Sequence, residues 1–514
     1  MRGPNRWWRG LGGPRVFALA LALAGGGVPT VASAAPPGAE PATRGDVQTP
    51  PPVAAAEESD DGSARVITVQ AVEIRGHQHV SERQIRTALT REGLRVGSEI
   101  VWPTDARVQR VRQRLRATGF FKVVTVGLEP VPEREDAALL VVEVEERSTV
   151  SIDRLYLGSS ALTPFRGGIS ILERNFAGRG VLLGGSFIWG SIPRVERGRR
   201  QQAYNVFAEA PQVADSNIGV LGGAFVISAG EPYRVTGAYD DPRPRHFRTF
   251  DYTRTGGLFG VTFPVLPQLR LGTDYRFERI DALLPAAPAY LDADGTATPV
   301  DLDVLDGTHR LTVATVALAY DGRRNSVLTG KGAQIGVDVQ LSSPALGSQY
   351  EYMKLVAVGA YTLRLPWRHW LTPRAQAGQI VGDAPRFEQF YAGDLSAWTP
   401  GREQSLRFST RNPIDVFGTG IDTREFGTAF GRFDLEYVWP VFRRTRTRGV
   451  YGGDLFVSAG VFTLVEDAPG RAARREAGER VAPTGFNADL GLRLDTALGT
   501  VKLTIGNVLR RSPL

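Results

Sequence analysis

The stretch from Ile169 to Gly190 reads ISILERNFAGRGVLLGGSFIWG, two apolar segments joined by a glycine-rich turn. In the second segment the large side chains fall on one side of an extended chain: Val181, Leu183, Phe187 and Trp189. Small residues on the other side include Gly184, Ser186 and Gly190. Alternation with period two predicts a strand with one face in an apolar medium and one in a polar medium. That apolar medium is either a protein core or a lipid bilayer.

Strand-like segments dominate from Val150 to the end of the chain, and the connections between them alternate in length. One set of connections is mostly short: 176–180, 211–216, 264–267, 321–330, 366–368, 440–449 and 496–499. The other set is mostly long: 159–167, 191–201, 230–250, 281–307, 342–349, 382–424 and 463–485. Short turns at one end and long loops at the other are typical of transmembrane β-barrels. Because only a closed barrel lets strands cross lipid with every backbone group paired, lipid is the favoured medium.

The number of strands decides how the first and last strands meet. Fifteen strands can be counted from Ser151 to about Val508, an odd number that would leave the two ends of the barrel on opposite sides of the membrane. Either a strand within 404–424 escapes the pattern or the last strand is reduced. Without a firm sixteenth strand, the seam between the first and last strands is expected to be weak.

The first 34 residues are predicted to be a secretory signal peptide. A basic start with Arg2 and Arg6 precedes an apolar middle, and Ala32-Ser33-Ala34 forms a small-residue cleavage site. An uncleaved membrane anchor is the alternative. The chain has no cysteine, which excludes disulfides and thiolate chemistry, and an exported chain without disulfides suits a bacterial cell envelope. Removing four arginines leaves 57 basic and 54 acidic residues, a balance that gives no reason to expect nucleic-acid binding.

Residues 35–65 are rich in proline, alanine and acids and are predicted to be a disordered linker. Residues 66–148 are predicted to form a small α+β domain in the order β-α-α-β-β. Ser81 and Gln84 have the spacing of a capping box for its first helix, and the second helix is expected to begin near Thr104 or Asp105. The length is sufficient for one small core.

This order of elements resembles a polypeptide-transport-associated (POTRA) domain. The residues that carry the resemblance are predicted to form turns and core: Gly76, Gly119, Phe120 and Phe121. Function in such a domain is expected at an exposed strand edge, which can pair with an extended client segment through main-chain hydrogen bonds.

Three further stretches resemble the BamA/TamA superfamily of outer-membrane assembly factors, also called the bacterial surface-antigen family. The first is the turn with Asn175, Phe176, Gly178 and Gly180. The second is a mid-barrel turn with Tyr320, Asp321, Arg323 and Gly332. The third is the C-terminal hairpin, Gly491 to Thr496 followed by Gly499 and Val501. The resemblance covers about residues 66–514 and implies an α+β POTRA domain in the periplasm followed by an all-β barrel of sixteen strands, at 150–514, in the outer membrane.

The family's sixth extracellular loop usually folds back into the barrel lumen with an Arg-Gly-Phe tip. In this chain the corresponding place follows Phe390-Tyr391-Ala392-Gly393 and contains Trp398, and the tip arginine is absent unless Arg402 takes its place. Gly393, Trp398 and Arg402 are therefore the candidates for a luminal loop, and whether this loop enters the lumen stays open.

No catalytic or cofactor motif is present, so an enzyme is not expected. There is no Gly-x-Ser-x-Gly elbow, phosphate loop or zinc-binding helix motif, and neither a metal nor a cofactor is predicted. His77 and His79 have no nearby third ligand and are interpreted as a solvated turn. A group of acids lacks the spacing of a calcium loop and is interpreted as a solvated loop: Asp292, Asp294, Asp301, Asp303 and Asp306. One short turn carries four arginines, which could contact anionic headgroups or simply be solvated: Arg443, Arg444, Arg446 and Arg448.

The sequence thus predicts a non-enzymatic outer-membrane barrel that inserts or translocates proteins. Its partners would be outer-membrane lipids, unfolded outer-membrane or secreted client proteins, and periplasmic chaperones or lipoproteins. Clients would dock on the edge of the POTRA domain and pass to the seam. Two alternatives stay open: a dedicated secretion pore for one exported partner, and a passive porin-like channel or adhesin.

Overall fold

The computed structural model describes residues 65–509, with gaps at 119, 133, 147–148, 159–162, 193–198, 212, 214–215, 217, 238–242, 267, 324–330, 393–401, 408–425, 444–449, 477, 479, 483 and 497–498. The predicted signal peptide, residues 1–34, and residues 35–64 of the predicted linker lie outside the described residues. None of the described helices is long and apolar enough to cross a membrane.

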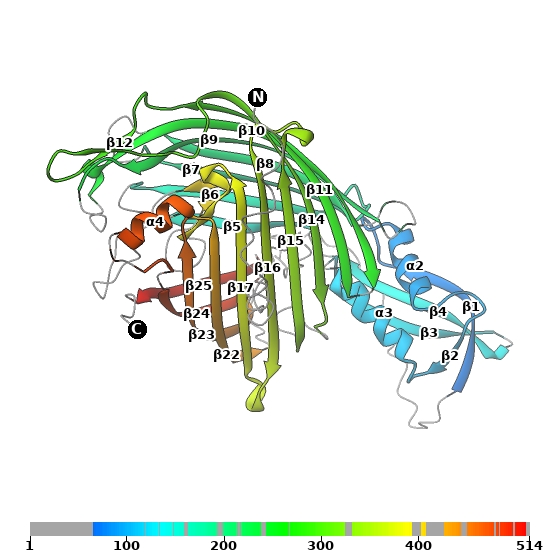
Figure 1. Ribbon diagram of the computed structural model, residues 1–514. Coiled ribbons are helices and arrows are strands. Elements are labelled where there is room, and N and C mark those ends of the chain that lie inside the picture. The colour runs from blue at the N-terminus through cyan, green and yellow to red at the C-terminus, as the bar shows by residue number, and fades with distance from the viewer. Residues whose placement is uncertain are drawn as a thin grey trace.

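A small α/β domain comes first, with its two helices packed on one four-stranded sheet (Figure 1). Its elements are β1 (Arg65–Arg75), α2 (Glu82–Arg91), β2 (Glu99–Trp102), α3 (Ala106–Ala117), β3 (Phe121–Val131) and β4 (Arg134–Glu146). The sheet order is β2-β1-β4-β3, with β1 parallel to β4 and the other pairs antiparallel. The buried stripe of α2, Ile85, Ala88 and Leu89, faces a core to which both helices and the sheet contribute.

Two details of this domain differ from the sequence prediction. The order is β-α-β-α-β-β, because the short strand β2 lies between the helices and pairs with β1. Of the four residues of β2 only Ile100 is buried, so this strand is too short to show a recognisable alternation. The capping box is also wrong: Ser81 is the N-cap of α2 but makes no side-chain cap hydrogen bond. The Gln84 backbone N–H donates instead to the Ser81 carbonyl, at 3.0 Å.

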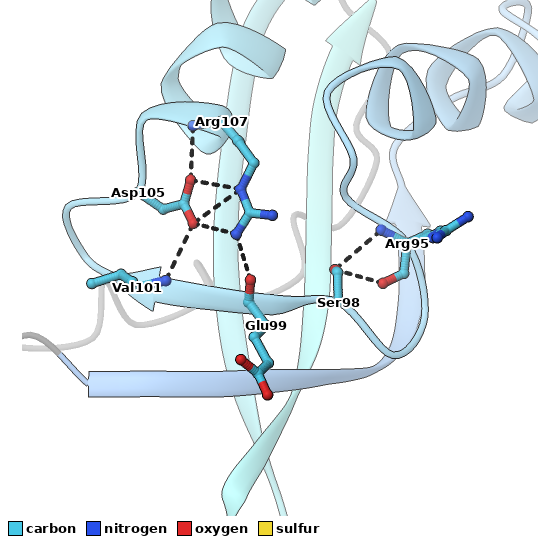
Figure 2. A network of polar contacts seen from close by, with 6 residues as sticks. All are labelled: Arg95, Ser98, Glu99, Val101, Asp105 and Arg107. Carbon is cyan, nitrogen blue, oxygen red and sulfur yellow. Dashed lines mark hydrogen bonds and ion pairs between the residues drawn. The ribbon is translucent and has the colours of Figure 1, made fainter.

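Asp105 ties the start of α3 to strand β2 (Figure 2). Its Oδ1 accepts a hydrogen bond from the Arg107 backbone N–H at 2.8 Å, and its Oδ2 accepts one from the Val101 N–H at 3.2 Å. The Arg107 guanidinium pairs with the same carboxylate and also donates to the Glu99 carbonyl. The side-chain bond to Arg107 is the main reason that the pKa of Asp105 falls to about 2, against the opposing effect of burial.

Replacing Asp105 with alanine should loosen this corner of the domain. The loss of the cap and of the bond to β2 is expected to destabilise the start of α3 by about 1–2 kcal/mol. Hydrogen exchange of the backbone amides of residues 101–108 in the full-length protein measures this. Because the pKa of Asp105 is lowered by folding, its contribution is complete above the ordinary aspartate pKa of about 3.9 and is lost as the pH falls through about 2. Glu99→Gln is the control, since only the Glu99 carbonyl takes part, and equal exchange in both variants would contradict the role of the carboxylate.

The rest of the chain forms one large antiparallel sheet of fifteen strands that curves around an interior (Figure 1). In sequence order the strands are β5 (Val150–Gly158), β6 (Arg166–Phe176), β7 (Val181–Gly190), β8 (Gln201–Ala210), β9 (Gly219–Arg234), β10 (Phe247–Leu266), β11 (Leu269–Leu283), β14 (Gly307–Asp321), β15 (Gly332–Ser342), β16 (Glu351–Arg364), β17 (Trp370–Asp383), β22 (Ala429–Arg443), β23 (Val450–Val465), β24 (Thr484–Thr496) and β25 (Gly499–Leu509). Each strand pairs with the next one in this order.

Several of the connections, long and short, carry short elements of their own. They contain α4 (Ala468–Glu476), the 3-10 turns η1 (Pro244–His246), η2 (Pro344–Leu346), η3 (Pro366–Arg368) and η4 (Arg386–Glu388), and the small strands β12 (Ala289–Leu291), β13 (Ala297–Pro299), β18 (Phe390–Tyr391), β19 (Arg402–Glu403), β20 (Leu406–Arg407) and β21 (Phe426–Gly427). Helix α4 was missed by the expectation of strands alone after Val150. Nine residues rich in alanine and arginine favour a helix without giving it a recognisable apolar stripe.

The predicted alternation is confirmed in the large sheet. Leu183 and Phe187 are 38% and 36% exposed on the outer face of β7, while Ile188 is 1% exposed on the inner face. On β22 the outer side chains Phe433 and Leu435 are exposed, whereas the inner acids are buried. The connection expected at 230–250 is shorter than predicted, because β9 and β10 remain paired out to Arg234 and Phe247. This hairpin therefore extends well past the span of about ten residues that lipid requires.

The two ends of the large sheet approach each other without pairing. Strands β5 and β25 come within 8 Å between Cα atoms, yet no ladder joins them in the described residues. Because the sheet is antiparallel and its strand number is odd, β5 and β25 run in the same direction. The expected sixteenth strand is not part of the described sheet: in the candidate stretch 404–424, Leu406–Arg407 form β20 in a separate small sheet, and 408–424 lie outside the described residues.

Candidate functional site: junction, luminal anchor and seam

The turn between β6 and β7 is locked by Asn175 and by two glycines with positive φ. The Oδ1 of Asn175 accepts the Gly180 N–H at 2.8 Å, and its carbonyl accepts the Gly178 N–H at 2.8 Å. Gly178 and Gly180 have φ of 70° and 68°, which L side chains rarely adopt. Asn175 is buried, whereas Phe176 is 50% exposed. These hydrogen bonds and the two glycine conformations thus make this turn rigid.

The same turn is fitted against the small domain. Asn175 Nδ2 donates to the His79 carbonyl at 3.3 Å, and the Ser81 N–H donates to the Gly178 carbonyl at 3.3 Å. A Cβ on Gly178 would lie 2.4 Å from the His79 carbonyl oxygen, and one on Gly180 would lie 2.5 Å from Nε2 of Gln84. The φ angle favours glycine at both positions, and the close approach of the His79 backbone also requires it at Gly178, whereas the flexible Gln84 side chain could move away from a Cβ on residue 180. We call this contact between 77–84 and 175–180 the junction.

Glu146, at the end of β4, shapes the small-domain side of the junction. Its carboxylate accepts the backbone N–H groups of three successive residues at 2.8 to 3.0 Å: Gln78, His79 and Val80. Burial acts to raise the pKa of Glu146, but these donors together hold it below its usual range. His79 Nδ1 lies 3.1 Å from the same carboxylate. Gly76 precedes this segment with a φ of 85°, and a Cβ there would collide with the Val144 carbonyl at 2.1 Å.

Replacing Gly178 with alanine should open the junction. The methyl group meets a backbone oxygen and the φ angle is left-handed, so we expect a local loss of about 1–3 kcal/mol. The readout is faster hydrogen exchange of the amides of residues 78–81 in the full-length protein. Gly295→Ala is the matched control, since Gly295 has a φ of 85° with nothing within 4 Å of its Cβ position. If Gly295→Ala raises exchange at 78–81 as much as Gly178→Ala does, the close approach is not what matters.

The other residues singled out in the small domain lie in its interior. Phe121 is 4% exposed, and Phe120 packs against the same core with its ring 6.3 Å from that of Phe121. Gly119 lies outside the described residues.

In the mid-barrel motif the residues at both ends of the turn are described, whereas 324–330 lie outside the described residues. The Arg323 guanidinium pairs with Asp321 at 2.7 Å, and the Asp321 N–H donates to the Gln268 carbonyl at 2.8 Å, which ties this turn to the neighbouring one. Gly332 has a φ of 144°, and a Cβ there would lie 2.6 Å from the Gly322 carbonyl oxygen. Tyr320 is 38% exposed at the end of its strand.

The loop that follows β17 turns back into the interior, and Glu388 anchors it there. Phe387, Glu388 and Phe390 are 4%, 7% and 7% exposed. The Glu388 carboxylate lies 3.1 Å from Arg254 of β10 and 2.9 Å from Arg276 of β11. These contacts hold the start of the loop, before Gly393, against the inner face of the sheet.

Arg254 is the centre of this luminal anchor, which we define as Arg254, Arg276, Glu278, Lys354 and Glu388. Its guanidinium is 1% exposed and donates to Glu278 through Nε at 2.7 Å and through Nη2 at 2.9 Å. It also stacks over the Phe387 ring, 4.1 Å from the ring centre. Lys354 of β16 donates to the Glu388 carbonyl at 2.8 Å. Three cations thus surround two carboxylates in a buried space.

A buried network of this kind holds the loop because it is nearly complete. Taking ions out of water is costly unless each is paired and hydrogen-bonded, and removing one partner leaves an uncompensated charge. Gly256 gives the network its room, since a Cβ there would lie 2.9 Å from Cγ of Glu278. Loop and wall are therefore joined by charge, with the carboxylate on the loop and the arginines on the wall.

The hairpin of β19 and β20, a later described part of the same loop, contacts β7. Gln404 donates through Nε2 to Ser186 Oγ, and Leu406 is completely buried. Arg402 begins β19, paired with Arg407 of β20. Gly393 and Trp398 lie outside the described residues. The described parts of the loop thus contact the inner wall at β10 and β11 and again at the neighbouring strands β7 to β9.

Acids of the long loop between β11 and β14 hold that loop together and brace the anchor. Asp306 accepts the Leu284 N–H at 2.9 Å, and Asp301 accepts the Asp303 N–H at 2.8 Å. The Arg386 N–H donates to the Asp303 carbonyl at 3.0 Å. Burial raises the pKa of the Asp303 carboxyl to about 6, although Arg386 acts against it. Within the described residues no three histidine or acidic side chains are grouped to hold a metal ion.

Replacing Glu388 with alanine should release the loop. Removing one partner of a buried ion network typically costs about 3–5 kcal/mol. We expect protease cleavage within 384–407 in folded protein and a rise in ion conductance across planar bilayers, because the interior is less filled. Glu351→Ala, at an exposed acid on β16, is the control. Unchanged protection and conductance in Glu388→Ala would show that the apolar contacts alone hold the loop.

The sequence did not reveal Glu388, Arg254 or Glu146. Arg254 and Glu388 are 134 positions apart, and no local pattern links an acid in a long loop to an arginine on a strand. The sequence contains one weaker signal. Arg276 and Glu278 are charged residues on the inner side of an alternating strand, where a charge needs a partner.

An antiparallel sheet with an apolar outer face, a charged inner face and a small α/β domain at one end defines a transmembrane β-barrel with an appended domain. The Omp85 superfamily domain matches residues 175–512. The match covers more than half of the chain, which therefore belongs to the Omp85 superfamily and is an outer-membrane β-barrel protein. The family expected from the turn motifs is thus confirmed.

Two solved structures have a similar fold. The first is the crystal structure of BamA from Haemophilus ducreyi lacking POTRA domains 1–3, with 12% identity, a TM-score of 0.53, and coverage of 87% of this chain and 82% of that chain. The second is CdiB from Escherichia coli, with 12% identity, a TM-score of 0.54, and coverage of 87% and 73%. No curated protein sequence matches this chain.

Proposed function

We propose that this protein inserts or translocates other proteins at the outer membrane, without catalysing a reaction. The small domain, residues 66–148, would be a POTRA domain in the periplasm, and residues 150–514 would form the barrel. The strand ends near the junction would then face the periplasm and the long loops the cell exterior. Residues 1–34 would be a signal peptide and 35–65 a linker.

The observation that supports this proposal most is the seam between β5 and β25. Their backbone groups share no ladder in the described residues, although the strands lie within 8 Å of each other. In lipid, unpaired backbone groups are expensive, so such edges favour pairing with another strand. Since β5 and β25 run in the same direction, one strand running opposite to both would complete an antiparallel wall. A client strand would satisfy this geometry.

The small domain offers a first docking place for such a strand. Strand β3 is at the edge of the sheet order and is eleven residues long, and its other side pairs with β4. Main-chain pairing on an edge has little sequence preference, which suits clients of many sequences. The junction then keeps this domain next to the first barrel hairpin, one strand from the seam.

The luminal anchor supports a route through the wall in preference to one through the lumen. The loop held by Glu388 contributes Phe387, Phe390 and Leu406 to the same buried cluster as the strand residues of the wall. A filled interior is a poor path for a passive solute channel. The seam is the part of the wall that a client could enter without displacing this cluster.

A disulfide across the seam tests the proposal. The chain has no native cysteine, so pairs introduced between Val150–Gly158 and Gly499–Leu509 can be oxidised selectively. Cells that depend on a tethered variant should lose most of their outer-membrane proteins, and reductant should restore them. The control is a tether inside the existing hairpin, Ala488→Cys with Asn507→Cys, which are direct partners in the ladder of β24 and β25.

Depletion of the protein separates the proposal from its alternatives. Loss of many outer-membrane proteins supports assembly. Loss of one secreted protein with the rest unchanged would make the chain a dedicated secretion pore. Changed solute uptake with no protein defect, together with a tolerated seam tether, would overturn both protein-handling functions.

A further inference from the structure

The turn between β16 and β17 places a tryptophan and an arginine where glycine and asparagine are usual. The His369 N–H donates to the Pro366 carbonyl at 3.2 Å, so Trp367 and Arg368 are the central residues of a β-turn. Both have positive φ, 55° and 67°. This is the pattern of a type I′ turn, which Asn-Gly favours because other side chains are strained there.

Trp367 gains no burial in return for this strain. Its side chain is 84% exposed. Strained positions persist when the surroundings or a function require them, and they cluster at binding sites. An exposed indole at the tip of a tight hairpin is therefore a candidate contact for a partner outside the chain.

An aromatic cluster continues from this tip along the outer face of the sheet. The His369 ring lies 6.1 Å from Trp367, 5.5 Å from Tyr437 and 5.8 Å from Trp439. His369 Nδ1 also bonds the Tyr437 hydroxyl. Tyr437 and Trp439 are 37% and 55% exposed on β22, in line with the outward Phe433 and Leu435. The cluster thus lies on the lipid-facing side, at the end of the strands.

Positive charge accompanies the aromatic rings. Arg368 is exposed beside Trp367, and no ion pair of its guanidinium is among the described contacts. Strand β17 pairs with β22, so the turn that follows β22 is the next one along this rim. That turn contains Arg443, Arg444, Arg446 and Arg448 in the sequence; residues 444–449 lie outside the described residues, and the inference does not depend on them.

We propose that Trp367, Arg368, His369 and Trp439 form a binding site for an anionic phospholipid. The indole rings would lie at the depth of the glycerol and headgroup, where amphipathic aromatic side chains are stable, and Arg368 would contact the phosphate. On the orientation proposed above, this lipid belongs to the periplasmic leaflet. The inference rests on the proposed function only through that orientation.

The site gives the strained turn a physical reason. A tryptophan and an arginine side by side at the tip reach farther than the Asn-Gly pair that the backbone would prefer. The strain lowers the stability of the isolated barrel, and binding of the lipid offsets it. The barrel would therefore be held at a fixed depth beside β17 and β22.

The test replaces the tip by the residues that the turn favours. The full-length double variant Trp367→Asn/Arg368→Gly should be at least as stable in neutral detergent as the parent protein, because Asn-Gly relieves the strain. In nanodiscs that contain both phosphatidylcholine and phosphatidylglycerol, native mass spectrometry of the released protein counts the retained lipid. We expect the parent to retain phosphatidylglycerol selectively and the variant to retain about tenfold less.

Two further variants keep the test decisive. Arg368→Gln leaves a non-glycine residue at the same φ and should lose the preference for phosphatidylglycerol while still retaining phosphatidylcholine. Phe259→Leu removes an aromatic ring that is 61% exposed on the outer face of β10, away from this turn, and should change neither lipid. Equal retention of phosphatidylglycerol by parent and double variant overturns the site. An equal loss of both lipids in Arg368→Gln overturns the role of charge. Client assembly is not read in this assay, so its outcome is independent of the proposed function.

Discussion

The constraint on which this structure depends is that lipid offers no hydrogen bonds to a backbone. Every N–H and C=O group on the membrane-spanning strands needs a partner within the sheet, and each interior strand finds two neighbours. Among the fifteen described strands of this sheet, only β5 and β25 have a single ladder, so their unpaired backbone groups lie together at one seam. The turns, the loops and the small domain stabilise the rest of the wall. The seam is therefore the place where backbone groups can still pair with another strand.

The interior obeys a second constraint, that a charge removed from water must be paired. The inner face of β10 and β11 presents Arg254, Arg276 and Glu278, which as a set carry one excess positive charge; Arg254 and Glu278 are buried, and Arg276 is partly exposed. The loop supplies Glu388 to balance it, and Lys354 binds the backbone of the same turn. One network of ion pairs and hydrogen bonds thus holds the loop against the wall. Apolar contacts of Phe387, Phe390 and Leu406 with the wall accompany this network.

Local periodicity explains what could be predicted from the sequence. Alternating side chains such as Leu183 and Phe187 indicate a strand, its outer face and its ends within ten residues. The turn glycines indicate positive φ. The short strand β2 escaped because one buried residue, Ile100, makes no period. The predicted capping box did not form. The Ser81 backbone N–H donates to the Gly178 carbonyl, a partner far along the chain. Glu388 and Glu146 escaped for the same reason: their roles are defined by residues that only the folded chain brings near.

The junction connects these constraints. Glu146 fixes the backbone of residues 78–80, which in turn contacts Asn175 and Gly178, and the chain between Glu146 and Val150 leads directly into β5. The small domain is therefore attached to the barrel twice, covalently at the seam strand and through hydrogen bonds at the turn after β6. Two attachments on adjacent strands define a hinge axis, so the domain can rotate about that axis without moving the β5–β6 pair, whereas any other movement of the domain displaces this pair. Strand β25 has no such attachment among the described residues. A movement of the small domain off that axis would consequently shift one side of the seam and leave the other in place, which is the displacement that the proposed entry of a client strand requires.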